Sequence, residues 1–414
     1  MSEHTNFDEL FTQSIGIREP WYIERSEFSA KDKAVHIYIA ARKGAKYACN
    51  ECGGMLDAHD YEQERIWQHG DVVFRPCYIH CRRPRVKCPR CGKIHVADAP
   101  WARFRSRYTL LFEAYAMELV EVLTVEEARK FLRISHTSLT NIVQYYVWKK
   151  VAGDNHSGIK RLNFDETSFK RGQSYVTVAC DSDARRVIGV EDGRSAKQIW
   201  EFSIKFEEKG GDCNAVEQCA SDMCGAYLLG ISAWFPNAIQ VVDRFHVKKL
   251  MLGAMDEVRR EEQGRAVSRS RKSGKKLLMI PQTRQSEQQA EKVAELCKAY
   301  PKTGRAFRMV QALDMIYTAR SMEEADGLFD SLYRWLRRSR LMPMKKVALT
   351  LQEHKKRILA YFVSRLTNAI AEGINSLIQA AKRKARGFRT FKGFATMIYL
   401  QCSKLDFPPI RLFV

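Results

Sequence analysis

The sequence has 414 residues, enough for about three domains of ordinary size. Apolar residues make up 45% of it, which can fill ordinary hydrophobic cores. Its 69 lysines and arginines against 48 acidic residues give a formal net charge of +21, which favours nucleic acid over a membrane surface as partner. Because the sequence lacks an apolar run of about 18 residues and starts with polar and acidic residues, neither a membrane span nor a secretory signal is expected.

Four of the twelve cysteines form two CxxC pairs within residues 1–100. Cys49 and Cys52 are followed by two glycines, and Cys88 and Cys91 by one. Zn²⁺ takes four thiolates in a tetrahedron, and glycine permits the left-handed backbone of a tight turn that presents each pair. The pattern predicts a zinc ribbon holding structural Zn²⁺, with a reduced, metal-free cluster as the alternative.

The stretch from Val72 to Val86, between the two pairs, is expected to be β-structure. Basic side chains lie in and after it, and three are expected to contact DNA phosphates: Arg82, Arg83 and Arg85. A solvated charged surface is the alternative. Cys77 and Cys81 are weaker ligand candidates, because they are spaced i,i+4 and no glycine follows them, so a role in packing or at the surface is expected for both.

Residues 101–152 are expected to form a helix-turn-helix. The predicted helices cover Ser106–Leu123, the segment after Thr124 up to Leu132, and Ser138 to about Trp148. Thr124 can cap the second of these, with Glu127 as its capping-box partner. The last helix of such a unit enters the DNA major groove, and the side chains expected there are Thr137, Ser138, Thr140 and Asn141. A plain packed helical hairpin is the alternative.

Residues 153–255 alternate between predicted strands and helices. The strands are expected at Ile159–Asp165, Ser174–Cys180, Val187–Val190, Ala215–Asp222 and Ala238–Asp243. The helices are expected at Ser195–Phe206, Met223–Ala233 and Arg244–Arg260. Three antiparallel strands followed by αβαβ is the element order of a ribonuclease H-like fold.

Two acids close strands that are neighbours in such a fold. Asp165 ends the first strand and Asp222 the fourth, and ligands gather beyond the carboxyl ends of strands in α/β sheets. Paired carboxylates at that place suit Mg²⁺ (or Mn²⁺), a hard ion that prefers oxygen ligands. Asp243 and His246 are possible neighbours of this site. The alternative is that Asp222 and Asp243 are ordinary helix N-caps.

Residues 366–382 predict an amphipathic helix. Asn368, Glu372, Asn375 and Gln379 fall in one narrow polar wedge, and Glu372 is its only charge. A lone acid among amides suits a site that faces a metal and a phosphate, and a solvated face is an equally open interpretation. Dense cations with Phe388 follow, which suits DNA contact, and the expected contacts are Lys382, Arg383, Lys384, Arg386 and Arg389.

These motifs together resemble bacterial insertion-sequence transposases of the IS-L-three family. The resemblance is carried by the two CxxC pairs and by Phe164-Asp165-Glu166, Ser221-Asp222-Met223, Asp243-Arg244-Phe245-His246-Val247, Asn368 with Glu372-Gly373-Ile374-Asn375, and Arg386-Gly387-Phe388-Arg389. It implies a DDE triad of Asp165, Asp222 and Glu372, with a helical insertion before the glutamate. Cys224-Gly225 departs from the family, whose members often have Trp or Ser followed by Pro there.

The expected architecture is multidomain, combining α+β and α/β parts. Its parts are a zinc ribbon (1–100), a helix-turn-helix (101–152), a ribonuclease H-like catalytic core in two pieces (153–255 and 341–414) and an α-helical insertion (256–340). The resemblance implies two-metal phosphoryl transfer, in which Asp165 bridges both ions while Asp222 and Glu372 each complete one.

The partners that this implies are double-stranded DNA, at the element ends and the target, and a second copy of the chain on that DNA. A bacterial cytoplasmic protein associated with the nucleoid is expected. Two other classes stay open. One is a transposase-derived regulator that binds DNA without cutting it, and the other is a ribonuclease H-like nuclease that acts on branched DNA.

Overall fold

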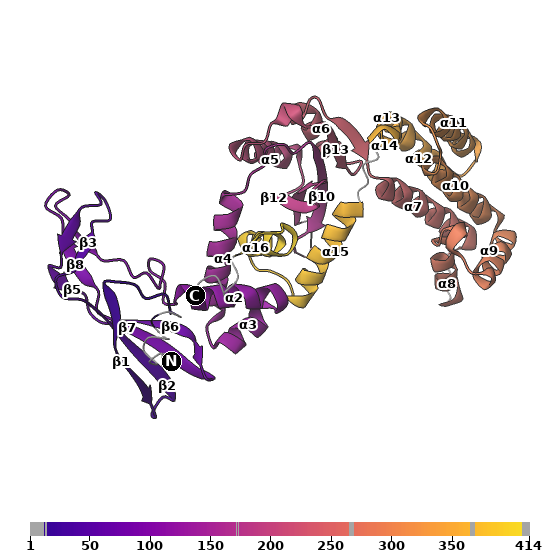
Figure 1. Cartoon of the computed structure of the whole chain (residues 1–414). Helices are drawn as coiled ribbons and strands as arrows, with labels where there is room; N and C mark the ends of the chain where they lie inside the picture. The colour runs from indigo at the N-terminus through magenta and orange to yellow at the C-terminus, as the bar shows by residue number, and fades with distance from the viewer. Residues whose placement is uncertain are drawn as a thin grey trace, which may run out of the picture. The chain divides into compact units, whose positions relative to one another are not determined.

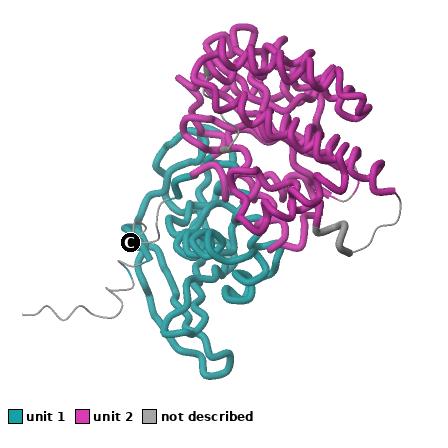
Figure 2. Tube along the Cα trace, turned by 90° about the vertical axis from the view of Figure 1, so that its right-hand side faces the viewer, with its two compact units in different colours: residues 1–150, 405–414 teal, residues 151–404 magenta. Residues whose placement is uncertain are grey.

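The computed structural model describes residues 12, 15–170, 172, 174–264, 269–364 and 369–407. The chain divides into two compact units, one of residues 1–150 and 405–414 and the other of residues 151–404 (Figure 2). Each unit combines α-helices with β-sheet, so the mixed α and β class expected from the sequence is observed. No helix within these described ranges is long and apolar enough to cross a lipid bilayer.

The first unit contains a four-stranded sheet in the order β1-β2-β7-β6 (Figure 1). Its strands are β1 (Trp21–Ser29), β2 (Ala34–Ala41), β6 (Arg65–Val72) and β7 (Arg75–Cys81). Strands β2 and β7 run parallel, and the other neighbours are antiparallel. The Trp101 ring packs edge-on against Trp21 and Trp67, with centroids 5.2 and 5.7 Å apart, and anchors the core of this unit.

Short strands carry the CxxC pairs: β3 (Lys46–Ala48), β4 (Met55–Asp57), β5 (Asp60–Tyr61), β8 (Pro84–Lys87) and β9 (Ile94–Val96). β3 pairs with β4, and β5, β8 and β9 form a separate sheet. The prediction of one β-stretch from Val72 to Val86 was wrong in detail. Val73 and Phe74 have φ angles of 48° and 61° and form the turn between β6 and β7, so this stretch contributes to two sheets.

Three helices complete the described part of this unit: α2 (Leu110–Val122), α3 (Val125–Leu132) and α4 (His136–Ala152). The predicted capping box is present, since Thr124 Oγ1 accepts the Glu127 N–H at 3.1 Å and Glu127 Oε2 accepts the Thr124 N–H at 2.9 Å. Helix α2 starts later than predicted because Thr109 caps it, and α4 starts earlier, at His136. Ala128 is fully buried, which lets α3 approach its neighbours closely.

The second unit is built on a five-stranded sheet in the order β12-β11-β10-β13-β14. Its strands are β10 (Arg161–Ser168), β11 (Tyr175–Asp181), β12 (Arg186–Asp192), β13 (Gln218–Ser221) and β14 (Ile239–Val242). β10, β11 and β12 are antiparallel, whereas β13 runs parallel to β10 and β14. The predicted order of strands and helices is the observed one. Several boundaries differ from the prediction. β10 continues to Ser168, so Asp165 lies within the strand, and β13 starts at Gln218 rather than at Ala215.

Helices cover both faces of this sheet (Figure 1). They are α5 (Ala196–Glu208), α6 (Gly225–Trp234), α15 (Ala369–Lys384) and α16 (Phe391–Cys402). A short 3-10 turn, η1 (Cys213–Ala215), lies between α5 and β13. Phe164 of β10 packs on Phe202 of α5, with ring centroids 5.4 Å apart. A Cβ at Gly189 would lie 2.4 Å from the Phe202 ring, so glycine is needed where α5 crosses β12. Helix α15 lies on the opposite face, where it bonds to the side chains that alternate with Phe164.

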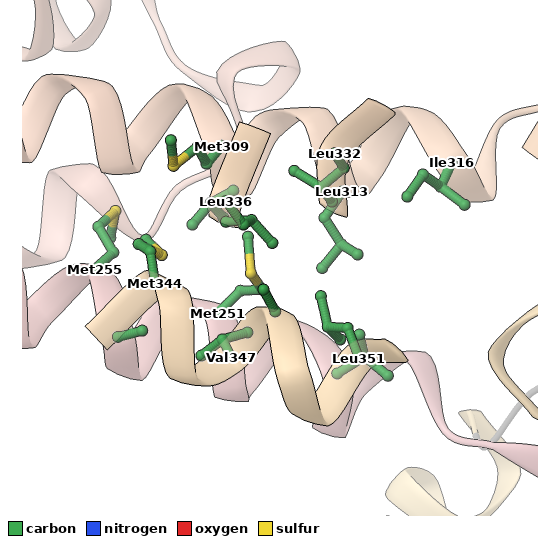
Figure 3. Close-up of a cluster of buried hydrophobic side chains, with 14 of the residues drawn as sticks. Met251, Met255, Met309, Leu313, Ile316, Leu332, Leu336, Met344, Val347 and Leu351 are labelled. Atoms are coloured by element: carbon green, nitrogen blue, oxygen red, sulfur yellow. The ribbon is translucent and has the colours of Figure 1, made fainter. Parts of the chain in front are cut away.

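A helical body with its own core separates α6 from α15. Its elements are α7 (Arg244–Gln263), α8 (Arg269–Leu278), η2 (Gln282–Arg284), α9 (Glu287–Ala299), α10 (Pro301–Tyr317), α11 (Met322–Arg338) and α12 (Met342–Glu353). The short helices α13 (Lys355–Leu359) and α14 (Tyr361–Ser364) lead back to the sheet next to β14. Met251, Leu313, Leu332 and Val347 come from four of these helices and meet in the buried cluster of Figure 3.

Candidate active site and cysteine cluster

The two CxxC pairs meet in one cluster in the first unit. The four Sγ atoms of Cys49, Cys52, Cys88 and Cys91 all lie within 4.8 Å of one another. The Sγ atoms of Cys49 and Cys91 are 3.9 Å apart, and those of Cys52 and Cys88 are 3.5 Å apart. Across the described residues, this is the one group of three or more histidine, cysteine or acidic side chains gathered closely enough to share a metal ion.

Backbone geometry holds each cysteine pair on a tight turn. Gly53 and Gly92 both have a φ of +69°, as the sequence predicted for the residues that follow the pairs. The Gly92 N–H donates to the Cys88 carbonyl at 2.9 Å, and the equivalent bond from Gly53 to Cys49 has the same length. Backbone N–H donation from the knuckle also lowers the pKa of Cys88 to about 7. A thiol so placed readily becomes the thiolate that a soft metal binds.

Cys77 and Cys81, the weaker ligand candidates, belong to the hydrophobic core of this unit. Both are fully buried on β7, and burial raises the pKa of each thiol to about 12. A thiol with so high a pKa stays protonated and apolar at neutral pH. Of the two expected roles, packing or a surface position, the structure shows packing for both.

Strand register brings three aspartates into one row in the second unit. Asn163 of β10 pairs with Ala220 of β13, and Ser221 pairs with Val242 of β14. Continuing this register, Asp165 lies two residues after Asn163, Asp222 follows Ser221, and Asp243 follows Val242. The three aspartates are therefore aligned across the strands. The Asp243 N–H donates to the Ser221 carbonyl at 3.0 Å, so the ladder continues to the level of this row. Aligned residues on parallel strands project to the same face.

Asp165 is the most buried member of the proposed triad. Its surface is 9% exposed, its Oδ1 accepts the Glu166 N–H at 2.8 Å, and its Oδ2 accepts a hydrogen bond from Asn375 Nδ2. Burial raises the pKa of Asp165 to about 6, and the negative charges of Asp243 and Asp222 add to the rise. Asp165 therefore lies in an environment that is both poorly solvated and already negative.

Asp243 and His246 form a pair at the start of α7. Asp243 Oδ1 accepts the Phe245 N–H at 3.0 Å, which caps the helix, and its Oδ2 lies 2.8 Å from His246 Nδ1. The hydrogen bond to Asp243 raises the pKa of His246, and the charges of Asp165 and Asp222 act in the same direction. The N-cap role of Asp243 is confirmed, and the pair also neighbours the acids, as the sequence suggested.

Glu372 lies on α15, whose polar stripe lies along β10. The charge of Asp243 acts on Glu372, but among the described residues the carboxylates of Asp165, Asp222 and Glu372 are not gathered closely enough to share one ion. Asn375 bonds to Asp165, Gln379 Nε2 donates to Thr167 Oγ1 at 2.7 Å, and Lys382 Nζ donates to the Ser168 carbonyl at 2.6 Å. The Asn375 and Gln379 side chains of the predicted polar wedge thus face the sheet, whereas Glu372 is exposed. Burial raises the pKa of Glu372, with a further contribution from Asp243, while Arg244 and His246 oppose it. Asn368, the first member of the wedge, lies outside the described residues.

The electrostatics of this acidic group suit a divalent cation. The charges of Asp222 and Asp243 both act on Asp165, and the charge of Asp243 also acts on Glu372. Bringing like charges together in a poorly solvated place raises their free energy unless a cation compensates. Oxygen donors without thiols or a set of imidazoles are the ligands that Mg²⁺ and Mn²⁺ prefer.

Two of the cations expected to contact DNA have structural partners instead. Arg83 is 8% exposed and donates to Glu62 at 2.6 and 3.2 Å, so its side chain closes an ion pair inside its own unit and is little available to DNA. Lys382 is bound to Ser168 and fixes α15 on β10. Phe388, the aromatic among the cations that follow α15, packs on Phe394 with ring centroids 5.2 Å apart.

The other expected DNA contacts are more accessible. Arg85 is partly exposed beside Asp60, and Arg82 is exposed. On and after the end of α15, the exposed cations are Arg383, Lys384, Arg386 and Arg389. In the first turns of α4, Thr137 and Asn141 are exposed, Ser138 and Thr140 are half-buried, and the intervening Leu139 is fully buried. Helix α4 thus packs one face and leaves the predicted polar face open.

Sequence reasoning missed two side chains next to the acids. Arg244 follows Asp243 and is exposed, and its charge acts on Glu372. Tyr317, at the end of α10, has a buried hydroxyl without a hydrogen-bond partner among the described groups, and Asp243 and Arg244 both influence its pKa. Tyr317 reaches this place only through the packing of the helical body, so no local pattern could have identified it.

Comparison with known proteins agrees for both halves of the chain. Residues 162–398 match a family profile described as "Transposase", and residues 97–147 match one described as "Helix-turn-helix domain of transposase family ISL3". The transposase for insertion sequence element IS1557 of Mycobacterium tuberculosis is 25% identical over 417 residues, covering 92% of each chain. The transposase for insertion sequence element IS1001 of Bordetella parapertussis is 26% identical over 391 residues, covering 92% of this chain and 95% of the relative.

Proposed function

The chain belongs to the ISL3 family of transposases, enzymes that cleave DNA strands and transfer them, and on this premise we propose that Asp165, Asp222 and Glu372 form its catalytic triad. The observation that supports this assignment best is the row of aspartates at the carboxyl end of the parallel strands, beside which α15 is bonded through Asn375 to Asp165. DDE chemistry is a general feature of this family, and no other acid in the row has a better claim, because Asp243 is occupied as a helix cap and by His246.

The chain's own residues would hold the reacting groups in place. Asn375 and the Glu166 N–H orient the Asp165 carboxylate, and the Cys224 N–H, which donates to Asp222 Oδ1 at 2.9 Å, orients that of Asp222. Asp165, Asp222 and Glu372 would hold divalent cations, whose chemistry when bound is to activate a water or a DNA 3′-hydroxyl and to stabilise the leaving oxygen. Mg²⁺ or Mn²⁺ fits these donors.

The reaction that we propose has two phosphoryl transfers. Water first displaces the 3′ oxygen of a nucleotide at the element's end, so the P–O bond to that oxygen breaks and a free 3′-hydroxyl remains. That hydroxyl then attacks a phosphodiester of the target, and the displaced strand leaves with its own 3′-hydroxyl. Both steps exchange one phosphodiester oxygen for another, so no covalent bond to the protein is needed.

DNA recognition is assigned to the first unit. The helix-turn-helix match supports DNA binding, and the exposed or half-buried Thr137, Ser138, Thr140 and Asn141 on α4 are the proposed base contacts in the terminal repeats. The cysteine cluster is proposed to hold structural Zn²⁺, which would fix its two hairpins. Arg82 and Arg85 near it, and the exposed cations after α15, are proposed to contact DNA phosphates.

The domain map follows from this assignment. We propose that residues 1–100 form the zinc-binding domain, 101–152 the helix-turn-helix, 153–255 and 341–414 a ribonuclease H-like catalytic core, and 256–340 the body of its helical insertion. Supporting this fold are the sheet order β12-β11-β10-β13-β14 and the parallel β13 and β14. Pairing two element ends needs two active sites, so we propose a homodimer on DNA that acts at the bacterial nucleoid.

Cleavage of end-containing DNA tests the triad. With Mg²⁺ and a duplex carrying the terminal repeat, the variants Asp165→Asn, Asp222→Asn and Glu372→Gln should cut about a thousandfold more slowly than the wild type, because each loses a charged ligand worth several kcal/mol. They should bind the duplex normally. The matched control is Glu166→Gln, next to Asp165 but paired with Arg194. Normal cleavage by the triad variants would disprove the assignment. If the wild type binds the ends but does not cut them, the protein is a regulator. If it cuts branched DNA regardless of end sequence, it is a junction nuclease.

A further inference from the structure

The first turn of α7 exposes an aromatic ring and a guanidinium beside the acidic group. Phe245 has 49% of its surface exposed, although apolar rings are stabilised by burial. Arg244 is exposed too, and within the described part of the chain no hydrogen bond or ion pair holds its guanidinium. Both side chains are therefore available to a ligand.

The position of this turn is fixed by the catalytic sheet. Asp243 lies in the aspartate row, and its Oδ1 accepts the Phe245 N–H at 3.0 Å. The Phe245 ring lies edge-on to the His246 imidazole, at 87° and with centroids 5.6 Å apart. Because His246 is itself bonded to Asp243, the ring lies against the imidazole that this aspartate holds, on the first turn of a helix rather than on a loop.

The chemistry of these two side chains matches a nucleotide. An aromatic ring offers a stacking surface to any base, and a guanidinium binds phosphate oxygens. A base inside a duplex has both faces covered by its neighbours, so an exposed ring can stack only on a base that has left the helix. Cleavage at the proposed triad would place the last nucleotide of the element next to this turn.

We propose that Phe245 stacks on an unpaired base at the cleaved end of the element, and that Arg244 holds the phosphate beside that base. This inference rests on the proposed function, since the acids define where the end lies. It adds a positioning role: opening the last base pair would let the strand end approach the carboxylates. Phe245 touches the substrate but takes no part in bond making.

A fluorescent base analogue tests the stacking without requiring cleavage. The analogue is placed at the terminal position of a pre-cut duplex and mixed with protein in the absence of divalent ions. Binding of the wild type should raise the fluorescence, because the base leaves its neighbours in the helix. Phe245→Ala should abolish the rise while still binding the duplex, and Phe245→Tyr should keep it. Phe245→Leu should behave like alanine, because it keeps the apolar volume and loses the ring.

Trp234→Ala is the matched control. Trp234 is a partly exposed aromatic, 41% accessible, in the same unit, at the end of α6 that lies away from the acids because α6 runs back from the carboxyl end of β13. This variant should retain the full fluorescence rise. An equal rise in wild type, Phe245→Ala and Phe245→Leu would overturn the proposal, as would a wild-type complex without any rise.

Cleavage of two end duplexes gives the second readout. On a fully paired end, Phe245→Ala should cut about tenfold more slowly, the size of one base–aromatic stack. On an end whose last pair is a mismatch, its rate should approach that of the wild type, because the pair is already open. An equal defect on both ends contradicts the proposal. If the wild type cuts neither end, the proposed function fails, whereas the fluorescence result still decides the stacking.

Discussion

The cysteine cluster and the acidic group are both suited to divalent metal ions, yet the chain assembles them in opposite ways. Each half of the cysteine cluster is a local turn of four residues, and the four sulfur atoms lie within 4.8 Å of one another. The acids come from β10, the end of β13 and α15, with the whole helical body between the last two. The first site is thus specified by short motifs, and the second by sheet register and helix docking.

This difference has an energetic consequence. Without a metal little holds the cysteine cluster together, because the strands that flank the two turns are only three or four residues long. The acids are held by a packed sheet that exists without the metal, and the raised pKa of Asp165 records the cost of burying it there. Metal removal should therefore unfold the first site and leave the second one folded but strained.

Loss of the cysteine cluster should have the largest effect. Structural Zn²⁺ binding contributes on the order of 10 kcal/mol to the folding of small zinc domains, so Cys88→Ser should release the metal and abolish the cooperative unfolding of this region. Metal content and thermal unfolding measure the result, and Cys297→Ser, a partly exposed cysteine of the helical body, is the control. Unchanged metal content in Cys88→Ser would show that the four thiols do not form one site.

A pH titration of the metal-free protein measures the strain at Asp165. The folded pKa of Asp165 is raised from 3.8 to about 6, so the folded state binds the proton more tightly than the unfolded chain does. Stability from this group is fully present below about pH 4 and is lost as the pH rises through 6, a loss of roughly 3 kcal/mol. Asp165→Asn should therefore be more stable than wild type at pH 7, by denaturant unfolding in a chelator, and nearly equal at pH 4.

Adding Mg²⁺ at pH 7 provides the control for this titration. The ion should stabilise the wild type and leave Asp165→Asn unaffected, because the variant has lost both the strain and the ligand. If the difference in unfolding free energy between the wild type and Asp165→Asn is the same at pH 7 as at pH 4, Asp165 is not strained.

Loss of the hydrogen bond that joins Asn375 of α15 to Asp165 should have an intermediate effect. Asn375→Ala removes the donor to Asp165, and a hydrogen bond to a charged group is worth about 1.5–3 kcal/mol, so the cleavage rate should fall about ten- to a hundredfold with DNA affinity unchanged. Gln379→Ala breaks the neighbouring bond to Thr167, which touches no acid, and should cost less. Equal defects in the two variants would mean that Asn375 only anchors the helix.

The exposed cations should have the smallest effect. Arg389→Gln should weaken binding of all duplexes alike and lower the slope of affinity against salt concentration by about one charge. Lys382→Gln should leave that slope unchanged, because Lys382 is bound to Ser168. A larger change in slope from Lys382→Gln than from Arg389→Gln would reverse this assignment.

The sequence predicted local chemistry better than it predicted contacts across the chain. The CxxC turns, the capping box of Thr124 and the strand order from β10 to β14 follow from short patterns, and all are observed. Strands β1 and β2 were not foreseen, and the turn at Val73 and Phe74 lacks the glycine or asparagine that marks such hairpins.

Side-chain partners were the least predictable feature. Arg83 belongs to a basic run in the sequence, but Glu62, on a neighbouring segment of the fold, buries it in an ion pair. Asp165 was expected at a strand end, whereas β10 runs on to Ser168 because its pairing with β11 continues after that with β13 has stopped. Both outcomes depend on which segments meet in space, and a single sequence does not state that.

Binding of Mn²⁺ to the protein on end-containing DNA tests most directly whether the three acids act together. Electron paramagnetic resonance of the complex should show bound Mn²⁺ in the wild type and in Gln379→Ala, and its loss in Asp165→Asn and in Glu372→Gln alike. If Asp165→Asn loses Mn²⁺ but Glu372→Gln binds it as well as the wild type does, the shared site is contradicted, because the glutamate from α15 then has no part in it.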